Sequence, residues 1–377
     1  MTLNSEDRGI LQQAAAELLD RWSGRSHVRA AVDGDRRVDP QTWRYIVDAG
    51  WTGLLIPESL GGSEGGLSAA TAVLQELGAH TTPGPFLSSA VLFAGALSGQ
   101  ANASVTQWLP RIADGSAVGS VAVGAVAARL RGGPWSLTCE ELPGGGVRFN
   151  GSAPLVLDAP VADVFMVIAG SQEGPVVALL DAEPGATVTE VPLIDRTRRC
   201  GNVEMGSGIS AESDTILARG GEAEQLIDRL TNIAALALTT DAVGAAARAL
   251  DLSVNYAKDR CQFGRPIGSF QAVKHKLANM YVTVAACQAA IEKAAEKFDS
   301  APLDASTQVA IAAASRFGRS GAGRVVGDAM QVHGGIGYTW EHDCHILMKR
   351  AKFAETYLSD GWAQGDRLVN ALRTGAA

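Results

Sequence analysis

The sequence lacks a cysteine pattern that would mark a disulfide framework or a zinc site. Its cysteines are odd in number, widely spaced and without a Cys-x-x-Cys pair; they are Cys139, Cys200, Cys261, Cys287 and Cys344. Scattered cysteines of this kind are typical of a reducing compartment. We therefore expect no disulfide, no metal and a cytoplasmic location.

The sequence also has no excess of basic residues. The 377 residues include 32 Lys and Arg against 40 Asp and Glu, which gives a formal net charge of −8. Nucleic-acid binding needs clustered cations that neutralise phosphates. This balance argues against a nucleic-acid partner.

Segments that would direct the chain to a membrane are lacking as well. Acidic residues stand near the N-terminus where a signal peptide would carry basic ones, and no apolar core follows. No run of 18 apolar residues occurs, because the best stretches, 155–167 and 233–247, are interrupted by Asp158, Asp163 and Asp241. We expect a soluble protein with no membrane partner.

Apolar residues make up 46% of the chain, which is enough for two or three domains with proper cores. Helical stripes fill residues 1–117, short β-rich runs between Gly, Pro and Asp clusters fill 118–219, and four long amphipathic patterns fill 220–377. The β-rich runs are 121–126, 146–150, 164–168, 176–180 and 187–191, and the four helical patterns are 222–259, 269–298, 305–332 and 341–372. The order predicts a mainly α protein with a central β domain and a C-terminal helical bundle.

The most informative stretch joins the first two of those four patterns. It reads Arg-Cys-Gln-Phe-Gly-Arg-Pro-Ile-Gly-Ser-Phe-Gln over residues 260–271. Gly264 and Pro266 break the helix, while Arg260, Gln262 and Arg265 place several donors at the break, which suits a phosphate or carboxylate. The alternative is that Arg260 caps a helix C-terminus and Gln262 is an ordinary loop residue.

Two motifs resemble the signatures of the acyl-CoA dehydrogenase family. One is Arg-x-Gln-Phe-Gly-x-Pro-Ile-x-x-Phe-Gln at 260–271, and the other is Gln-Val-His-Gly-Gly-Ile-Gly-Tyr at 331–338. Their separation and the α–β–α order also match that family. The resemblance implies an N-terminal helical domain, a middle β-barrel and a C-terminal four-helix bundle.

The resemblance implies a chemistry and a cofactor. Acyl-CoA dehydrogenases remove a proton from the carbon α to a thioester and a hydride from the β carbon, and the hydride goes to FAD. Their C-terminal domain reaches across a subunit interface to hold a neighbour's FAD. The residues here that match those cofactor contacts are Arg260, Gln262, Phe263, Gln271, Gln331, Gly334 and Gly335.

The same resemblance implies the partners. They are an acyl-CoA substrate, an electron-transfer acceptor protein and further subunits, as a homo- or hetero-tetramer with a second acyl-CoA dehydrogenase subunit.

The middle domain departs from the family pattern. Nothing in 120–129 matches the usual Thr-Glu-Pro-x-x-Gly-Ser-Asp loop, and 151–158 keeps only the local frame of the usual Trp-Ile-Thr-Asn segment. The resemblance therefore does not predict the contacts to the flavin ring in this chain.

The positions of the catalytic base also depart from the family pattern. The usual Tyr-Glu-Gly-Thr segment aligns with 357–360, which puts Leu358 on the Glu, and the base position used by a minority of the family falls on Ala234. Both usual bases are absent. Asp241 lies two turns after Ala234, roughly 10 Å along the helix axis on the same face, and is our candidate base.

Other interpretations of these acids remain open. Asp241 could instead pair with a nearby Arg or cap a neighbouring turn, and Glu355 and Asp360 flank the vacant position but lie off its face.

These departures resemble a subset of the family, actinobacterial acyl-CoA dehydrogenases that act on steroid side chains and assemble from two different subunits. The segments that carry this likeness are His333, 340–343 and 83–86. We expect an acyl-CoA dehydrogenase for a bulky or steroid-type acyl group, as one subunit of a hetero-oligomer. The alternatives are a non-catalytic partner that completes the FAD site of a sister subunit, and a flavin-dependent oxidase or monooxygenase on the same fold.

Overall fold

The computed structural model describes residues 5–34, 40–124, 135–206, 208–358, 368, 369 and 373. The described residues form two compact units. One unit holds Ala31–Ala70 and Pro83–Ala234, and the other holds the N-terminal residues up to Ala30, Thr71–Thr82 and the chain from Ala235 onward. Each unit is described by itself.

The first unit combines helices with a sheet. Its helical segments are α3 (Pro40–Asp48), η1 (Trp51–Gly53), η2 (Glu58–Leu60), η3 (Phe86–Phe93), α5 (Ala94–Leu97), α6 (Ala103–Ala113) and η4 (Ala159–Val161). Helix α3 begins at Pro40, where Pro suits the first helical position. The segment η3 is a π-helix whose eight residues are all buried.

The predicted β domain is a nine-stranded mixed sheet in the described residues. Its strands are β1 (Gly119–Val123), β2 (Leu137–Glu141), β3 (Val147–Leu157), β4 (Val164–Ser171), β5 (Gly174–Asp181), β6 (Thr187–Val191), β7 (Cys200–Met205), β8 (Ser210–Ala211) and β9 (Ile216–Arg219). They are ordered β6-β7-β3-β2-β4-β5-β9, while β1 pairs with β4 and β8 pairs with β3. The predicted β runs match β1, β3, β4, β5 and β6; the end of the first run, at 125–126, lies outside the described residues.

The sheet is held by a continuous apolar core. Strand β4 is buried over seven of its eight residues and pairs with β1 in parallel and with β5 in antiparallel register. A strand buried on both faces reads as a near-continuous apolar run, which is why the sequence predicts a strand at 164–168, within the observed β4. Phe149, Phe165 and Val203 are fully buried in the same cluster.

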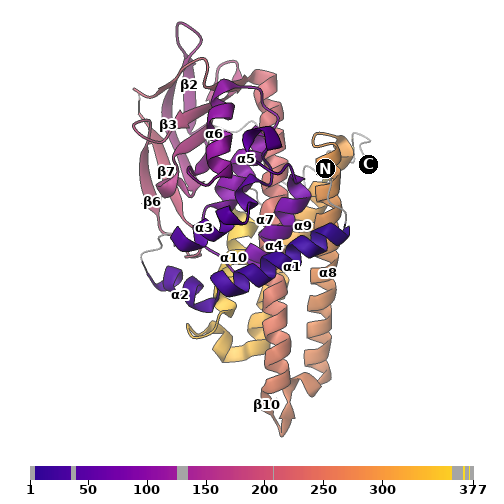
Figure 1. Cartoon of the computed structure of the whole chain (residues 1–377). Helices are drawn as coiled ribbons and strands as arrows, with labels where there is room; N and C mark the ends of the chain where they lie inside the picture. The colour runs from indigo at the N-terminus through magenta and orange to yellow at the C-terminus, as the bar shows by residue number, and fades with distance from the viewer. Residues whose placement is uncertain are drawn as a thin grey trace. The chain divides into compact units, whose positions relative to one another are not determined.

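The second unit is helical (Figure 1). Its elements are α1 (Ser5–Trp22), most of α2 (Arg25–Asp33) and α4 (Gly66–Ala79), the larger part of α7 (Gly220–Asp259), α8 (Gln271–Ser300), α9 (Ala305–His333), η6 (Gly334–Tyr338) and α10 (Cys344–Thr356). The first three predicted C-terminal helices are confirmed, and the fourth is α10. Most of the predicted span beyond residue 358 lies outside the described residues.

Helix α7 packs through glycine at its closest contact. A Cβ added to Gly244 would lie 2.0 Å from the Gln75 carbonyl oxygen, and one added to Gly78 would lie 2.2 Å from the Asp241 carbonyl oxygen. Only glycine allows backbones to approach so closely. Gly78 and Gly244 therefore allow close packing between α4 and α7. Helix α7 is also long and apolar enough to span a membrane, but 89% of its apolar window is buried inside the protein, as in a core helix.

Candidate functional site

The joint between α7 and α8 is a β-hairpin rather than a bare helix break. Strand β10 (Cys261–Gln262) pairs antiparallel with β11 (Arg265–Pro266), and the two-residue loop between them has positive φ at both positions, 52° at Phe263 and 78° at Gly264. Two positive φ values define a type I′ turn, the tight turn that matches strand twist. Figure 1 shows this hairpin at the end of the long helices α7 and α8.

The hairpin presents its side chains to solvent. Arg260, Gln262 and Arg265 are exposed, and Phe263 is 92% exposed. Phe270 anchors the hairpin, because the Arg265 guanidinium lies 4.2 Å from its ring centre and the Phe263 ring meets it edge-on at 6.2 Å. A phenylalanine this exposed at a rigid tip is typical of a surface that contacts another molecule.

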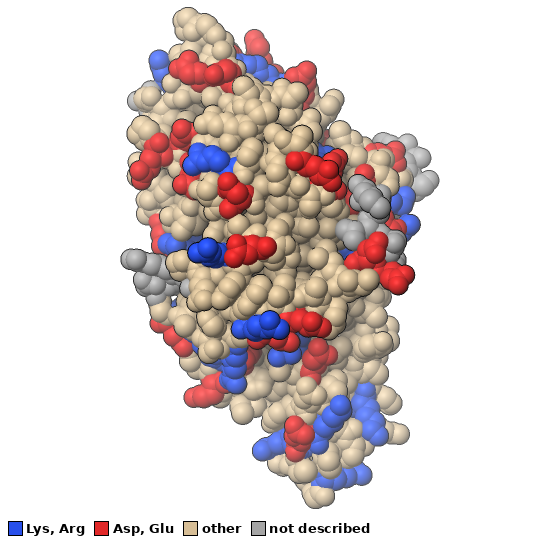
Figure 2. Space-filling view, in the orientation of Figure 1, with Lys and Arg blue, Asp and Glu red and all other residues tan. Residues whose placement is uncertain are grey.

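Positive charge gathers at the same end of the unit. Figure 2 shows Lys and Arg side chains around the end that Figure 1 labels β10. The exposed cations nearest the hairpin in sequence are Lys258, Arg260, Arg265 and Lys274. In a chain of net charge −8, this local excess suits a phosphate-bearing ligand.

The second motif lies at the end of α9. Gln331 is exposed, Gly334 follows the helix with a φ of 63°, and Gly335 is exposed within η6. A Cβ at either glycine would meet no atom within 4 Å, so the backbone here is open to a ligand. The structure also brings the two motifs into the same region, since the ring of Tyr256, one turn before Arg260, packs against that of His333 at a tilt of 30°, with ring centres 4.6 Å apart.

Asp241, our candidate base, is engaged in a buried ion pair. Its side chain is 0% exposed and that of Arg350 is 1% exposed. Arg350 Nε donates to Asp241 Oδ2 at 2.8 Å and its Nη2 donates to Oδ1 at 2.9 Å, while Nη2 also reaches the Thr82 carbonyl at 3.3 Å. A carboxylate held on both oxygens by a guanidinium accepts a proton poorly. The geometry favours the alternative that the sequence left open, an Arg partner.

Arg319 is a buried arginine that hydrogen-bonds to the sequence neighbours of the two residues that the family resemblance aligns with the base positions. Arg319 is 3% exposed and donates through Nη1 to the Tyr357 carbonyl and through Nη2 to the Ala235 carbonyl, both at 3.4 Å. Tyr357 and Ala235 are the immediate neighbours of Leu358 and Ala234, the positions aligned with the two bases. Arg319 therefore links the interior of α7 to the residue that follows α10, and neither aligned position carries a carboxylate.

Burial sets the proton affinity of that cation. Desolvation lowers the pKa of Arg319 to about 10, and the charge of Glu355 opposes the shift. Arg319 still carries its charge at neutral pH. Sequence reasoning missed this residue, because α9 also carries Arg316 and Arg324 and nothing in the sequence distinguishes Arg319 from them.

The other predicted acids are less informative. Glu355 is half-buried and pairs with Lys352 at 2.6 Å, while Asp360 lies outside the described residues. The stretch 120–129 is described only up to Gly124. Segment 151–158 is the end of β3 and the residue after it, with positive φ at Leu155 and Asp158.

The described residues combine N-terminal helices, a buried mixed sheet and a C-terminal helical unit that ends in an exposed hairpin. Profiles described as "Acyl-CoA dehydrogenase, N-terminal domain" and "Acyl-CoA dehydrogenase, C-terminal domain" match residues 5–116 and 225–358. Acyl-CoA dehydrogenase IpdE2 of Mycolicibacterium smegmatis is 33% identical over 348 residues, covering 92% of this chain and 93% of the relative. The chain belongs to the acyl-CoA dehydrogenase family.

Solved structures agree with this assignment. The ChsE4-ChsE5 complex from Mycobacterium tuberculosis matches with a TM-score of 0.88 at 29% identity, covering 98% of both chains. A variant of the Tcur3481-Tcur3483 steroid ACAD matches with a TM-score of 0.86 at 28% identity, covering 98% of this chain and 99% of that one. The predicted family and fold are confirmed, including the likeness to the actinobacterial steroid-type group.

Proposed function

We propose that this chain is one subunit of an FAD-dependent acyl-CoA dehydrogenase that works with a second, different subunit. It belongs to an oxidoreductase family whose members desaturate acyl-CoA thioesters. The observation that carries the proposal is the contrast between its two halves: an exposed clamp at Arg260, Gln262 and Phe263, and a base region occupied by Leu358 and the buried cation of Arg319.

The clamp residues fit a dinucleotide. Exposed guanidinium and amide donors at Arg260 and Gln262 suit the pyrophosphate, and the open glycines Gly334 and Gly335 let the chain backbone approach the adenosine half. Gln331 and Gln271 are exposed near these segments and supply further donors. FAD bound there would accept the hydride removed from the substrate's β carbon.

Since the hairpin points away from its own unit, we infer that the clamp serves a flavin in a site shared with another subunit. Phe263 would then be covered on assembly, which accounts for its exposure in the single chain. The base that removes the α proton would come from the sister subunit. The names of the similar structures, a ChsE4-ChsE5 complex and a steroid ACAD, support a hetero-oligomer and a bulky or steroid-type acyl group.

The proposal also covers the electron acceptor and the cellular compartment. An electron-transfer protein is the expected acceptor, because the family passes electrons onward from its flavin. All five cysteines are free, which is consistent with a reducing, cytoplasmic setting.

A self-sufficient dehydrogenase with Asp241 as base is the second candidate, since Asp241 is a buried carboxylate on the helix that carries the minority base position. Co-expression separates the two candidates. The chain would be purified alone and together with acyl-CoA dehydrogenase chains encoded beside it, and each sample tested anaerobically with a set of acyl-CoA thioesters. Turnover by the pair alone supports the shared site, whereas turnover by the isolated chain that Asp241→Asn abolishes would establish the second candidate.

A further inference from the structure

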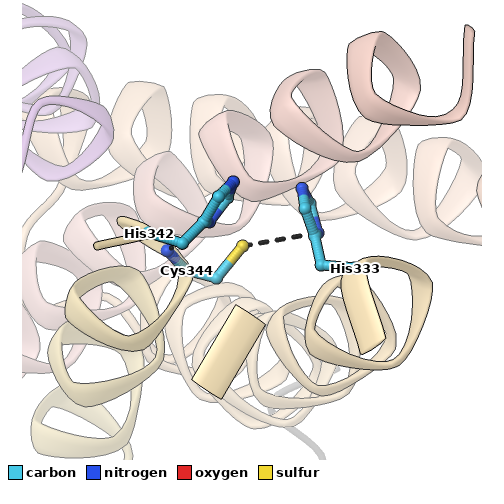
Figure 3. A group of neighbouring side chains, drawn as sticks. All are labelled: His333, His342 and Cys344. Carbon is cyan, nitrogen blue, oxygen red and sulfur yellow. Dashed lines mark hydrogen bonds between the residues drawn. The ribbon is translucent and has the colours of Figure 1, made fainter. Parts of the chain in front are cut away.

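Three potential metal ligands converge beside the second motif. His333 is the last residue of α9, His342 lies in the turn before α10, and Cys344 is the first residue of α10. One potential ligand atom from each lies within 4.8 Å of the other two. Figure 3 shows the two imidazole rings side by side with the sulfur close to both.

The hydrogen bonds of His333 leave one ring nitrogen available. Its Nδ1 lies 2.8 Å from the Ala329 carbonyl oxygen and therefore carries the proton that it donates. The other ring nitrogen, Nε2, is buried in a side chain only 3% exposed and makes no hydrogen bond of normal geometry to a described residue, although the Leu252 backbone also lies close to the ring. A carbonyl that holds one ring nitrogen in this way is a common feature of metal-binding histidines.

His342 and Cys344 complete the donor set. The Cys344 sulfur lies 3.4 Å from His333 Nδ1, and the rings of His333 and His342 have centres 4.4 Å apart. The Cys344 amide lies 3.3 Å from His342 Nδ1, a long hydrogen bond that costs little to give up. Ligands around tetrahedral zinc lie about 2.0–2.3 Å from the metal, so donor atoms that lie within 4.8 Å of one another must draw closer to share one ion.

The carboxylate closest to the cluster in sequence is already paired with arginines. The nearest carboxylate in sequence, Asp343, is occupied by Arg29 at 2.7 Å and Arg25 at 3.0 Å.

We propose that His333, His342 and Cys344 bind one zinc ion, with water in the fourth position. Two neutral imidazoles and a thiolate match the borderline-soft character of zinc. Binding replaces the thiol proton: Zn²⁺ and the Cys344 S–H give a Zn–S bond and one H⁺ released to solvent. The ion would tie the end of α9 to the start of α10 and so fix the loop between them, which carries Gly334 and Gly335.

The test uses the full-length chain, stripped with a chelator, loaded with zinc and desalted. Bound metal is measured by elemental analysis, and Co²⁺ replaces zinc as a spectroscopic probe for a thiolate ligand. We expect about one zinc per chain and a cobalt–thiolate charge-transfer band. Cys344→Ala and His342→Ala should lose both signals. Cys261→Ala is the matched control, because Cys261 is exposed and outside the cluster, and it should keep both.

The outcomes separate a built site from adventitious binding. Zinc that washes out of the wild-type chain, or that remains with unchanged stoichiometry in Cys344→Ala, would overturn the proposal. Circular dichroism and the Tm of metal-free Cys344→Ala show whether the variant is folded. If it were not, His342→Ala, which alters a partly exposed side chain, gives the same test. None of these readouts depends on flavin binding or turnover.

Discussion

Replacing Asp241 by Asn tests whether this residue is structural or catalytic. The pair with Arg350 has two charge-assisted hydrogen bonds, at 2.8 and 2.9 Å, and both side chains are at most 1% exposed. Removing one partner of such a pair leaves a buried charge uncompensated and costs about 3–5 kcal/mol. In a folding unit of roughly 150–250 residues, each kcal/mol of lost stability lowers the Tm by about 2–4 °C, so we predict a Tm decrease of roughly 6–20 °C.

The assay is thermal unfolding followed by circular dichroism, together with turnover of the assembled enzyme below the lower Tm. Glu224→Gln is the matched control, because Glu224 is exposed on the same helix, and we expect a Tm change within about 2 °C. The double variant Asp241→Leu/Arg350→Met removes both charges and should recover much of the lost stability. An Asp241→Asn chain with wild-type Tm and turnover lowered by more than about 10³-fold would refute the structural role and identify Asp241 as the base.

Three further predictions follow from the structure. Arg260→Ala should weaken the FAD affinity of the assembled enzyme by roughly 10- to 100-fold, because a charge-assisted hydrogen bond is lost, and flavin fluorescence measures this affinity. Arg44→Ala changes an exposed arginine elsewhere and should have no effect on FAD affinity. Equal FAD affinities of Arg260→Ala and the wild type would contradict the role of Arg260 in cofactor binding. Phe263→Ser should leave the Tm of the isolated chain unchanged but reduce association with the sister subunit in analytical ultracentrifugation, and unchanged association would show that the hairpin tip is not an interface. Desolvation raises the pKa of Glu76, so ionisation of Glu76 in the folded protein costs stability as the pH rises. The Tm of Glu76→Gln should match that of the wild type near pH 4 and exceed it at pH 7. A Tm of Glu76→Gln below the wild-type Tm at pH 7 would contradict this direction of the pKa shift.

The long elements could be predicted from sequence because each repeats a simple pattern over many residues. The stripes of α7, α8 and α9 and the apolar run of β4 all gave boundaries within a few residues of those observed. The sequence predicted the hairpin at 261–266 only as a helix break, because phenylalanine rarely adopts the positive φ that a type I′ turn requires and that Phe263 has here. The family motif located this segment, but not its strand pairing.

The partners of buried charges could not be predicted, because they depend on contacts between distant segments. Asp241 and Arg350 are 109 residues apart in sequence, and Arg319 reaches the interior of α7 and the residue after α10. The cluster of His333, His342 and Cys344 was missed for a related reason. Its spacing matches no common zinc motif, and only the fold of the turn before α10 brings the three side chains together.

The central claim, that this chain contributes a clamp to a shared flavin site, is tested most directly by visible absorption spectroscopy. The chain purified alone and the chain purified with its sister subunit would be compared before and after anaerobic addition of mixed acyl-CoA thioesters. We predict a colourless isolated chain and a yellow complex whose flavin band bleaches on addition of substrate. A yellow isolated chain that bleaches by itself would contradict the claim.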